Sequence, residues 1–458
     1  METAPAEVMA DAAKPSPRRP RKRRWLLWLL ALPVLVAGLW IWVHSVPWAG
    51  PFVANSLRSV IGRDNVARLE DFVYAVEDRV NRVVLSHRRP KSYWKVPPRL
   101  QTAVTPEKAG TPASPSPVSP GSEGAPSEKH PAEPFQPVSP GPVPDSFAPE
   151  GDGIWVPMTD SRRPSEAPRL YKTLLHPDKS RSWAELFVVA VDLNTVEVLP
   201  VLGYQEPRTD KPEAQGYERR AKIPEEHWGA LLGAFNGGFM AEHGGYGFAY
   251  DGITFLDPRE DACTLAHFAD GGFEVRTWTA LKENVSSMVW YRQAPACMVE
   301  NGELHPLIKV HQSRKWGATL DGETVIRRSA VGLSADRKVL FVGITNHTTA
   351  KVLAMGMRHA GAIDVAQMDV NWSYPKFVTY SPDKKGVLRP VALAEGFEFS
   401  QQLYLRERSM RDFFYLARKE EVHVEFPSLG AAPGKLTQSP PNDSRPSGAG
   451  EPAAKPEP

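Results

Sequence analysis

Two stretches of this sequence place glycines and polar residues where they could bind and convert a ligand. The first is the loop "FNGGFMAEHGGYG" (Phe235 to Gly247), which follows the apolar segment "ALLGA". Paired glycines after a buried strand allow positive φ angles and let a ligand approach the backbone closely. A β-bulge or a tight hairpin would also use glycines, but it accounts less well for the second group, Gly244, Gly245 and Gly247. We therefore expect this loop to line a binding site.

Polar residues also end two apolar segments in the C-terminal half. Asn346 ends "KVLFVGITN", and Asp369, Asn371 and Ser373 end "AIDVAQMDVNWS". Ligands of open sheets bind outside the carboxyl ends of strands, and the N-terminus of a helix expected near Thr348 would attract an anion. The alternative is that Asn346 and Thr348 only cap that helix and that Asp369 begins a turn.

The segments around these residues predict a β-sheet. In the first half, "AELFVVAVDL", "VEVLPVL", "GFAYDGITF" and "FEVRTW" have the composition of strands. In the second half, "KVLFVGIT" and "AIDVAQMDV" flank "TTAKVLAMGMRHA", which has helical periodicity and ends before Gly361. This order predicts a β-α-β unit with parallel strands and a right-handed crossover. We expect a mixed β-sheet domain, between α/β and α+β in class, preceded by one transmembrane helix.

The order of these motifs resembles the phosphodiester glycosidase family. "FNGGFM", followed by "RRSAVGLSADRKVLFVGITNHTTAKVLAMGMRHAGAIDVAQMDVNWS", is similar to the family's N-G-G-F/Y loop, R-T/S-A-x-G strand, second strand, helix and D-G-G-G-S strand end. The resemblance covers about residues 185–373 and implies cleavage of a sugar from a phosphodiester. It implies that Asn236, Gly237 and Gly238 form the active-site loop, with Arg328 and Asp369 at the family's Arg and Asp positions. Where the family has D-G-G-G-S, this chain has "DVNWS", so Trp372 could form a stacking wall for a sugar ring.

The residues expected in the site follow from the two stretches and the resemblance. Those expected to be catalytic are Asn236, Arg328 and Asp369. Those expected to bind substrate are Gly237, Gly238, Phe239, His243, Tyr246, Asn346, Asn371, Trp372 and Ser373.

The chemistry that the resemblance implies is physically reasonable. The group that leaves C1 is a phosphate monoester with a second pKa of about 6, so it needs little protonation, unlike the alcohol leaving group of ordinary glycosidases. The forked guanidinium of Arg328 suits a phosphate, and Asp369 could orient water or stabilise positive charge on the sugar carbon. Arg327 and Arg328 face opposite ways in a strand, so at most one of them enters the site.

Two other functions remain open from the sequence. The chain could be a non-catalytic glycan-binding or envelope and exopolysaccharide assembly protein that keeps the pocket. It could also be a metal-dependent hydrolase that uses His243, Glu242 or Asp251, although these lack a ligand spacing such as HExxH. The metal therefore stays unknown: the sequence requires no cofactor and does not exclude a divalent cation.

The N-terminal region predicts a membrane anchor. A basic tail (1–24) precedes the uncharged apolar run "WLLWLLALPVLVAGLWIWV" (25–43), whose length matches a hydrocarbon core of about 30 Å. A cleaved secretory signal would have a shorter apolar region and small residues at the cleavage site. The positive-inside rule places the tail in the cytoplasm and the remaining chain outside it, in the periplasm if the source is a Gram-negative bacterium.

The rest of the chain divides by composition. Residues 51–89 have the spacing of an amphipathic helix, which could pack on the main domain or on another copy, or lie on lipid, although its acidic residues oppose the last option. A Pro-rich stretch (96–149) and a C-terminal tail (427–458) have the composition of disordered segments. The folded domain between them spans 151–426.

The net charge limits the classes of binding partner, and the cysteine content limits the possible disulfide bonds. The 458 residues carry a formal net charge of +2, without the basic field of a nucleic-acid-binding domain. We therefore expect a glycan or sugar-phosphate partner and no nucleic acid. Cys263 and Cys297 are the two cysteines; an exported domain permits a bridge between them, but their spacing does not decide whether it forms.

Overall fold

The computed structural model describes residues 60–86, 88–101, 135–310, 313–317, 324–397, 399–424 and 427–430, with isolated positions between 31 and 42. The chain divides into two compact units, Met1–Leu69 and Glu70–Pro458, and the contacts reported below lie within the second. Across these described residues, no helix has the length and apolar character needed to cross a membrane. The predicted basic tail and anchor (1–24 and 25–43) fall outside them, apart from the isolated positions.

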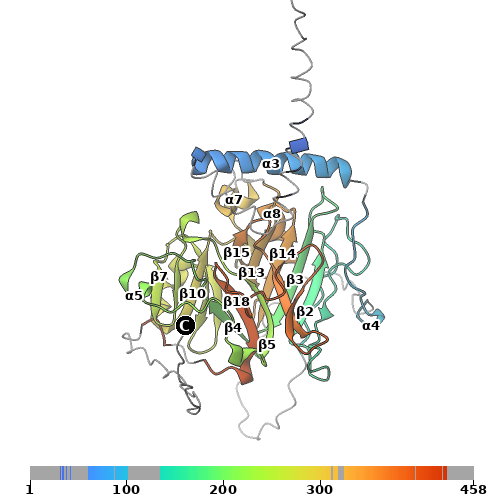
Figure 1. The fold of residues 1–458 in the computed structure, drawn as a ribbon. Helices are drawn as coiled ribbons and strands as arrows, with labels where there is room; N and C mark the ends of the chain where they lie inside the picture. The colour runs from blue at the N-terminus through green and yellow to red at the C-terminus, as the bar shows by residue number, and fades with distance from the viewer. Residues whose placement is uncertain are drawn as a thin grey trace, which may run out of the picture. The chain divides into compact units, whose positions relative to one another are not determined.

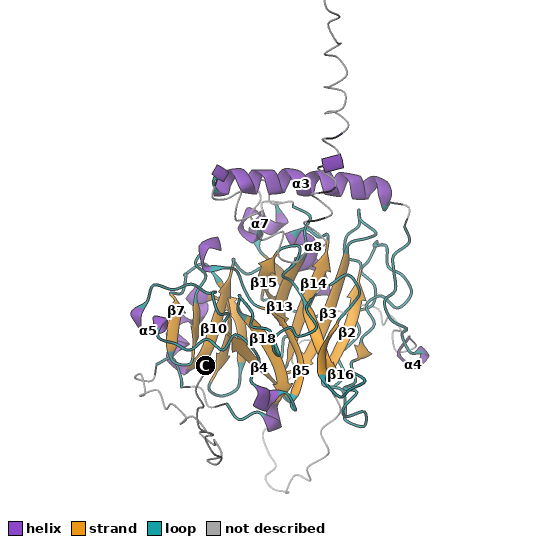
Figure 2. Cartoon of the chain, in the orientation of Figure 1, coloured by secondary structure: helices purple, strands orange, loops and turns teal. Residues whose placement is uncertain are grey.

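Strands dominate the described part of the chain (Figure 2), where they form three sheets. Sheet A has the strand order β1-β2-β3-β14-β13-β15-β11-β12. Its strands are β1 (Val156–Pro157), β2 (Leu170–Leu175), β3 (Glu185–Asp192), β11 (Val299–Glu300), β12 (Glu303–Leu304), β13 (Arg328–Leu333), β14 (Val339–Asn346) and β15 (Asp364–Val370). Each pairing between neighbours in this sheet is antiparallel.

The two smaller sheets are also antiparallel. Sheet B has the order β17-β16-β5-β18-β4, and sheet C has the order β7-β6-β10-β8-β9. Sheet B consists of β4 (Val196–Val201), β5 (Leu231–Asn236), β16 (Phe377–Pro382), β17 (Leu388–Ala392) and β18 (Phe413–Arg418). Sheet C consists of β6 (Phe248–Tyr250), β7 (Ile253–Leu256), β8 (Cys263–Phe268), β9 (Phe273–Thr277) and β10 (Met288–Ala294).

The helices of the described residues are few and mostly short (Figure 1). They are α3 (Arg63–Val84), α4 (Pro98–Gln101), α5 (Pro212–Gln215), α6 (Trp278–Leu281), α7 (Pro306–Lys309) and α8 (Ala350–His359). The 3₁₀ turns are η1 (Glu225–His227), η2 (Ala241–His243), η3 (Lys282–Ser287), η4 (Ser313–Trp316) and η5 (Lys419–Glu421). Helix α3 lies within the stretch 51–89 that the sequence assigns to an amphipathic helix.

Sheet A is covered on both faces, and this explains its apolar strands. Alternate residues of β3 contribute to different cores, as the two-residue period of a strand requires. Phe187 and Val189 belong to the core shared with sheets B and C. Leu186 and Val188 belong to the core that contains helix α8. The polar ends of the β13, β14 and β15 strands are therefore fixed between well-packed layers.

The predicted β-α-β unit is present in chain order, but its strands are not neighbours. Strand β13 lies between β14 and β15 and is antiparallel to both, so β14 and β15 run in the same direction without pairing. The short turn from β13 to β14 makes those two strands a hairpin, and α8 must then carry the chain past β13. The expectation of adjacent parallel strands was wrong. The fold is β-rich and antiparallel, with few helices.

The folded region also extends beyond the predicted boundary at Gly151. Phe135 and Val143, placed in the Pro-rich spacer by composition, pack on the core that contains α8. Tyr93 and Trp94 pack on the core between the sheets. A Pro-rich segment in extended form can still bury single aromatic and apolar side chains, which a compositional argument does not register. Residues 102–134 and 431–458 lie outside the described residues.

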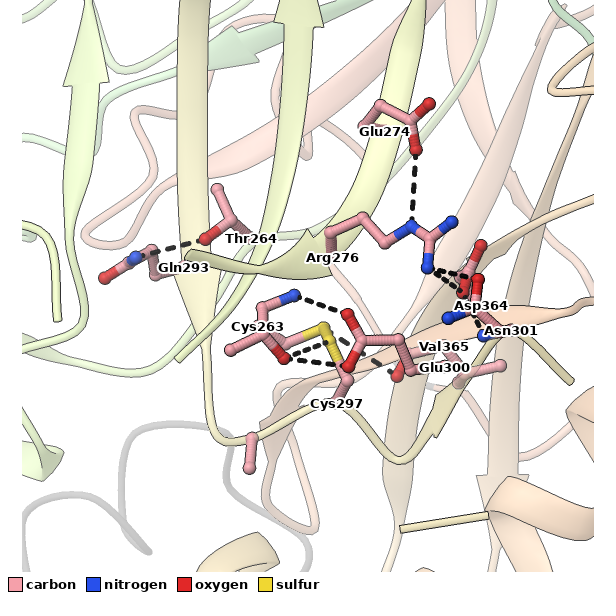
Figure 3. The surroundings of a disulfide bond; sticks show 12 residues. Cys263, Thr264, Glu274, Arg276, Gln293, Cys297, Glu300, Asn301, Asp364 and Val365 are labelled. Atoms are coloured by element: carbon pink, nitrogen blue, oxygen red, sulfur yellow. Dashed lines mark hydrogen bonds and ion pairs between the residues drawn. A yellow bond between two sulfur atoms is a disulfide. The ribbon is translucent and has the colours of Figure 1, made fainter. Parts of the chain in front are cut away.

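A disulfide bond joins sheet C to sheet A (Figure 3). Cys263 begins β8, and Cys297 lies just before β11, with the two Cα atoms 4.6 Å apart. Around the bridge, the Thr277 N–H and hydroxyl donate to the Glu300 carboxylate at 3.0 and 2.9 Å. The bridge and these bonds fix one edge of sheet C to the main sheet.

Replacing both cysteines by serine should destabilise the domain substantially. The bridge closes a loop with a sequence separation of 34, and the chain-entropy model gives about 3–4 kcal/mol for a loop of that length. Urea unfolding of the wild type and of Cys263→Ser/Cys297→Ser measures the difference. Wild type treated with reductant serves as the control and should approach the variant. A difference below about 1 kcal/mol would mean that the native contacts alone fix this edge.

Candidate functional site

The ends of β5 and β15 meet where sheets A and B face each other. The Asn236 side-chain amide donates to the Ser329 hydroxyl at 2.8 Å, and that hydroxyl donates to the Asp369 carbonyl at 2.9 Å. Asn236 also accepts the Lys376 amide at 3.1 Å. The structure thus brings together Asn236 and Asp369, two residues that the sequence places in one site. We refer to this region, with Arg327, Lys376 and Arg411, as the inter-sheet site.

A shift in strand register aims Asp369 into the inter-sheet site. Ala330 pairs with Gln367, but Arg328 pairs with Val370, so β15 accommodates one extra residue at this point. Such bulges reorient side chains and are common beside active sites. Asp369 is 2% exposed. Its Oδ1 accepts the Val370 amide at 2.8 Å, and its Oδ2 accepts a hydrogen bond from Arg411.

Arg411 is the partner of Asp369 that the sequence did not reveal. Its guanidinium pairs with Asp369 Oδ2, lies 2.8 Å from Met240 Sδ and stacks 4.4 Å above the Tyr374 ring. Arg411 comes from the irregular segment before β18, which has no periodic or motif signal. Sequence alone gives no reason to place it beside Asp369.

Arg328 does not share a site with Asp369. Its buried guanidinium donates to the carbonyls of Thr348 at 3.1 Å and Thr324 at 3.0 Å, to Gln367 Oε1 at 2.9 Å, and to the Trp316 carbonyl. These contacts lie on the α8 side of sheet A, so the expectation that Arg328 joins Asp369 is not met. Arg328 and Arg327 face opposite ways, as two successive strand residues must.

Arg327 is the arginine on the inter-sheet face. Its guanidinium lies 4.8 Å from the Trp372 ring and 4.5 Å from the Phe397 ring, and it donates to the Gly396 carbonyl at 2.9 Å. The His347 ring lies 5.3 Å from Trp372. Burial, and then the positive charge of Arg327, lowers the pKa of His347 to about 4, so this imidazole is neutral at pH 7. Together they form an aromatic wall with one fixed cation.

Lys376 adds a second cation next to Asn236. Lys376 is half-buried, and no hydrogen bond or ion pair of its ammonium is found within the described part of the chain. The carboxylate of Glu407 acts on it at longer range and raises its pKa. Burial, and then the charge of Arg327, lowers the pKa of Lys376 to about 8. A lysine that is desolvated beside an arginine is stabilised by an anionic ligand, because an anion offsets both costs. No sequence pattern distinguishes Lys376 from a surface lysine.

The remaining predicted residues at this edge have structural partners. The Asn346 amide donates to Glu185 Oε2 at 3.1 Å, and the Tyr93 hydroxyl donates to the same carboxylate. Burial raises the pKa of Glu185. Helix α8 is capped by Thr349, whose hydroxyl accepts the Val352 amide, so neither Asn346 nor Thr348 is its cap.

Asn371 and Ser373 form the turn beyond β15. Asn371 is half-buried, whereas Ser373 is exposed. The Ser373 amide donates to Asn371 Oδ1 at 3.2 Å. This bond fixes the turn that carries Trp372 beside Arg327.

The glycine loop is held by a buried ion pair, which sequence reasoning missed. Arg292 on β10 pairs with Asp412 at 2.9 Å, with both side chains almost fully buried. The Gly237 amide donates to the Asp412 carbonyl at 3.0 Å, and the Gly238 amide donates to Asp412 Oδ2 at 3.2 Å. Arg292 also donates to the carbonyls of Phe239 at 2.5 Å and Tyr246 at 3.0 Å. One ion pair therefore fixes both ends of the loop.

Close packing, not positive φ, explains the first two glycines. A Cβ on Gly237 would lie 2.3 Å from Asp412, and one on Gly238 would lie 2.8 Å from the Arg292 guanidinium. Only the later pair, Gly244 (φ 124°) and Gly245 (φ 58°), needs positive φ in this loop. The backbone thus approaches its own ion pair here, where the sequence argument expected a ligand.

His243 and Tyr246 lie in the outer part of the loop. His243 pairs with Glu242 at 3.6 Å, and the Tyr246 ring contacts the Phe239 ring at 5.8 Å. Among the described residues, no group of three or more His, Cys, Asp or Glu is placed to hold a metal ion.

A cavity of about 260 Å³ lies elsewhere, lined by β1, β2, β5, β16 and the end of β18. Two arginines that line it form ion pairs with carboxylates. Arg418 pairs with Asp160 and Glu166, and Arg169 pairs with Glu166. None of the predicted site residues lines it. We assign the candidate site to the inter-sheet region, where Asp369, Arg411, Arg327 and Lys376 gather, and not to this ion-paired cavity.

Comparisons with known proteins give distant structural likenesses. No protein-family model matches the chain, and no curated protein matches it. The catalytic domain of zebrafish N-acetylglucosamine-1-phosphodiester alpha-N-acetylglucosaminidase, auto-inhibited by its pro-peptide, matches with a TM-score of 0.35 and 15% identity, covering 58% of this chain and 87% of that chain. A hypothetical protein from Synechocystis matches with a TM-score of 0.30 and 8% identity, covering 56% of this chain and 65% of that chain. These are resemblances of structure at low identity, and the function is inferred below from this chain's own residues.

Proposed function

We propose that this protein is a glycosidase-type hydrolase that releases a sugar from a sugar-1-phosphodiester in a surface or secreted glycan. The observation that carries the proposal is the composition of the inter-sheet site. A buried carboxylate, Asp369, lies beside Asn236, and Arg327 and Lys376 supply cations at the same edge. A sugar flanked by a phosphate needs both kinds of group.

The two parts of the site have different tasks in this proposal. Lys376 and Arg327 stabilise the negative charge that develops on the departing phosphate, which is where preorganised charge accelerates a reaction. Asp369 is held by Arg411 and acts at the sugar carbon, where it orients water or stabilises positive charge. Trp372 and His347 provide an apolar wall for the sugar ring.

A second candidate is a glycan-binding protein without catalysis. The observation in its favour is the state of Asp369, whose two carboxylate oxygens already accept bonds from Val370 and Arg411. This carboxylate must lose one of these hydrogen bonds before it can act on water or on a sugar carbon. Turnover of a panel of sugar-1-phosphodiesters by the wild type separates the candidates, because only the hydrolase releases free sugar.

We also propose that the domain lies outside the cytoplasm, tethered by the predicted span 25–43. The Cys263–Cys297 bridge supports an oxidising compartment, where disulfides persist. Protease added to intact cells or spheroplasts should cut the Pro-rich stretch and release the folded domain. Protection until the inner membrane is lysed would overturn this orientation.

The charge of Lys376 gives the site a pH dependence. With a pKa of about 8, the ammonium is charged below pH 8 and neutral above it. A phosphodiester keeps its single negative charge across this range, so its affinity should fall by up to about tenfold per pH unit above 8. Lys376→Met should bind about tenfold more weakly at pH 7 and lose this dependence, because a hydrogen bond to a charged group contributes roughly 1.5–3 kcal/mol.

Titration calorimetry with a non-hydrolysable sugar-1-phosphonate monoester, which carries the same single negative charge, measures this effect from pH 6.5 to 9.5. Lys384→Met, which removes an exposed lysine from the turn between β16 and β17, is the matched control and should behave as wild type. A wild-type affinity that is flat across pH 8, or one unchanged in Lys376→Met, would remove Lys376 from the site. It would leave the assignment of Asp369 to be tested separately.

A further inference from the structure

We propose that the exposed apolar face of α3 binds the surface of an anionic lipid bilayer. Phe72, Val76, Val80 and Val83 are 67, 40, 52 and 75% exposed. Their spacing of three and four residues places them on one face of the helix. A contiguous apolar face of this kind on a folded protein indicates an interaction surface.

Two acidic residues of α3, Glu77 and Asp78, are directed towards the domain. Asp78 accepts two hydrogen bonds from Arg181, at 2.7 and 2.8 Å. Glu77 lies 3.9 Å from the His347 ring. From the sequence alone these carboxylates oppose a lipid surface. In the structure they attach the helix to the domain, and the apolar face points away from them.

Basic residues border the apolar face. Arg79 is exposed and follows Val76 by three positions, so it lies at the edge of the apolar face. Arg82 pairs with Asp78 at 3.0 Å, whereas Arg88 and Arg89 are exposed just beyond the helix. Interfacial helices combine an apolar face with flanking Lys or Arg, which are attracted to anionic lipids.

The two most exposed residues of the face argue against a second copy as the occupant. An apolar seam exists with Val73 and Val80 at a and Leu69, Val76 and Val83 at d, but it leaves Phe72 outside and includes Val73, which is half-buried. The register that places both Phe72 and Val83 in the seam puts Arg79 at a d position. A charged residue at a d position would be buried in the seam of a paired coiled coil. At a bilayer surface, the same arginine extends to the headgroups.

The position of α3 in the chain also favours a membrane. The apolar run 25–43 that predicts a span ends at Val43, and α3 begins at Arg63. In a chain anchored by that run, a connection of 19 residues (44–62) allows α3 to reach the bilayer surface. The inference does not depend on the enzymatic activity.

Spin labels on the full chain test the proposal. Val76→Cys and Val80→Cys carry the labels in vesicles of phosphatidylcholine and phosphatidylglycerol, and Lys384→Cys, in an exposed turn, is the matched control. We expect the α3 labels to collide more with oxygen and less with a water-soluble nickel chelate than the control label. Adding Arg79→Glu should reduce this difference in the anionic vesicles but not in pure phosphatidylcholine.

Three results would overturn the proposal. The α3 labels could be as accessible to the nickel chelate as the control label. They could show dipolar coupling between molecules, which would identify a second copy on this face. The chain could also fail to associate with the vesicles.

Discussion

Asp369→Asn is expected to slow sugar release by orders of magnitude from any sugar-1-phosphodiester that the wild type hydrolyses. The substitution keeps the shape of the side chain but removes the negative charge that acts at the sugar carbon. Positioned acid or base groups contribute about 10²- to 10⁴-fold to rate, and a loss in that range is expected in kcat. The rate should be measured per folded molecule, with unfolding free energies measured alongside.

Stability must be measured because Asp369 belongs to a buried ion pair. Neutralising it leaves Arg411 without its carboxylate, and breaking a buried pair costs roughly 3–5 kcal/mol. The structure therefore predicts a loss of stability together with the loss of rate. Loss of activity alone would not separate a chemical role from a folding defect.

The same strand offers a matched control. Asp364 begins β15, is fully buried and pairs with Arg337. Asp369 lies near the end of the same strand and pairs with Arg411. Asp364→Asn should cost comparable stability and leave kcat unchanged. Equal rates for the two variants would exclude Asp369 from the mechanism. A wild type inactive on every phosphodiester would favour the binding protein.

The local sequence pattern predicted individual strands and helices better than it predicted which strands pair with each other. The apolar run of β14 and the helical period of α8 are properties of neighbouring residues, and both elements formed. Their pairing was not predictable, because it depends on distant segments. Strand β3 is followed at once by β4, yet β3 pairs with β14 in sheet A, whereas β4 joins sheet B. Strand order is set by burial of whole faces, which no short window of sequence contains.

The residues of the candidate site also divide into those that the sequence predicted and those that it did not. Asn236 and Asp369 were predictable because each ends a buried strand. The choice between Arg327 and Arg328 was not, because a one-residue change in register exchanges the two faces of a strand. The register shift that orients Asp369 has no sequence signature. Arg411 comes from an irregular segment whose path is fixed by backbone hydrogen bonds with residues 204–206 and 221.

The glycine loop shows that a sequence motif can have a physical cause other than the expected one. Gly237 and Gly238 were expected to leave space for a ligand beside the backbone. In the structure that space is filled by Asp412 and Arg292. Packing therefore explains these two glycines, and the part of the loop in a binding site stays a prediction. What keeps this loop beside Asp369 is the ion pair, and that dependence can be measured.

Removing one partner of the Arg292–Asp412 pair is expected to cost about 3–5 kcal/mol of unfolding free energy, because it leaves an uncompensated buried charge. In Asp412→Ala the Gly238 amide also loses its acceptor, and a buried unsatisfied donor adds about 1–3 kcal/mol. Arg292→Met removes the donors to Phe239 and Tyr246 and should cost a similar amount. Urea unfolding measures the stability of each variant.

The double variant Arg292→Met/Asp412→Ala separates the stability that comes from the ion pair from the stability that each side chain contributes by itself. Because it leaves no isolated charge, it should be less destabilised than the sum of the single variants, with a coupling of about 0.5–3 kcal/mol. Hydrogen exchange at the amides of Gly237 and Gly238 should accelerate in both variants that lack Asp412, since their acceptors there are lost or displaced. Additive losses, or unchanged exchange at these two amides, would mean that the loop is held by its other contacts. In that case its position beside Asp369 would depend on the packing of β5 and β18 instead of on this charge pair.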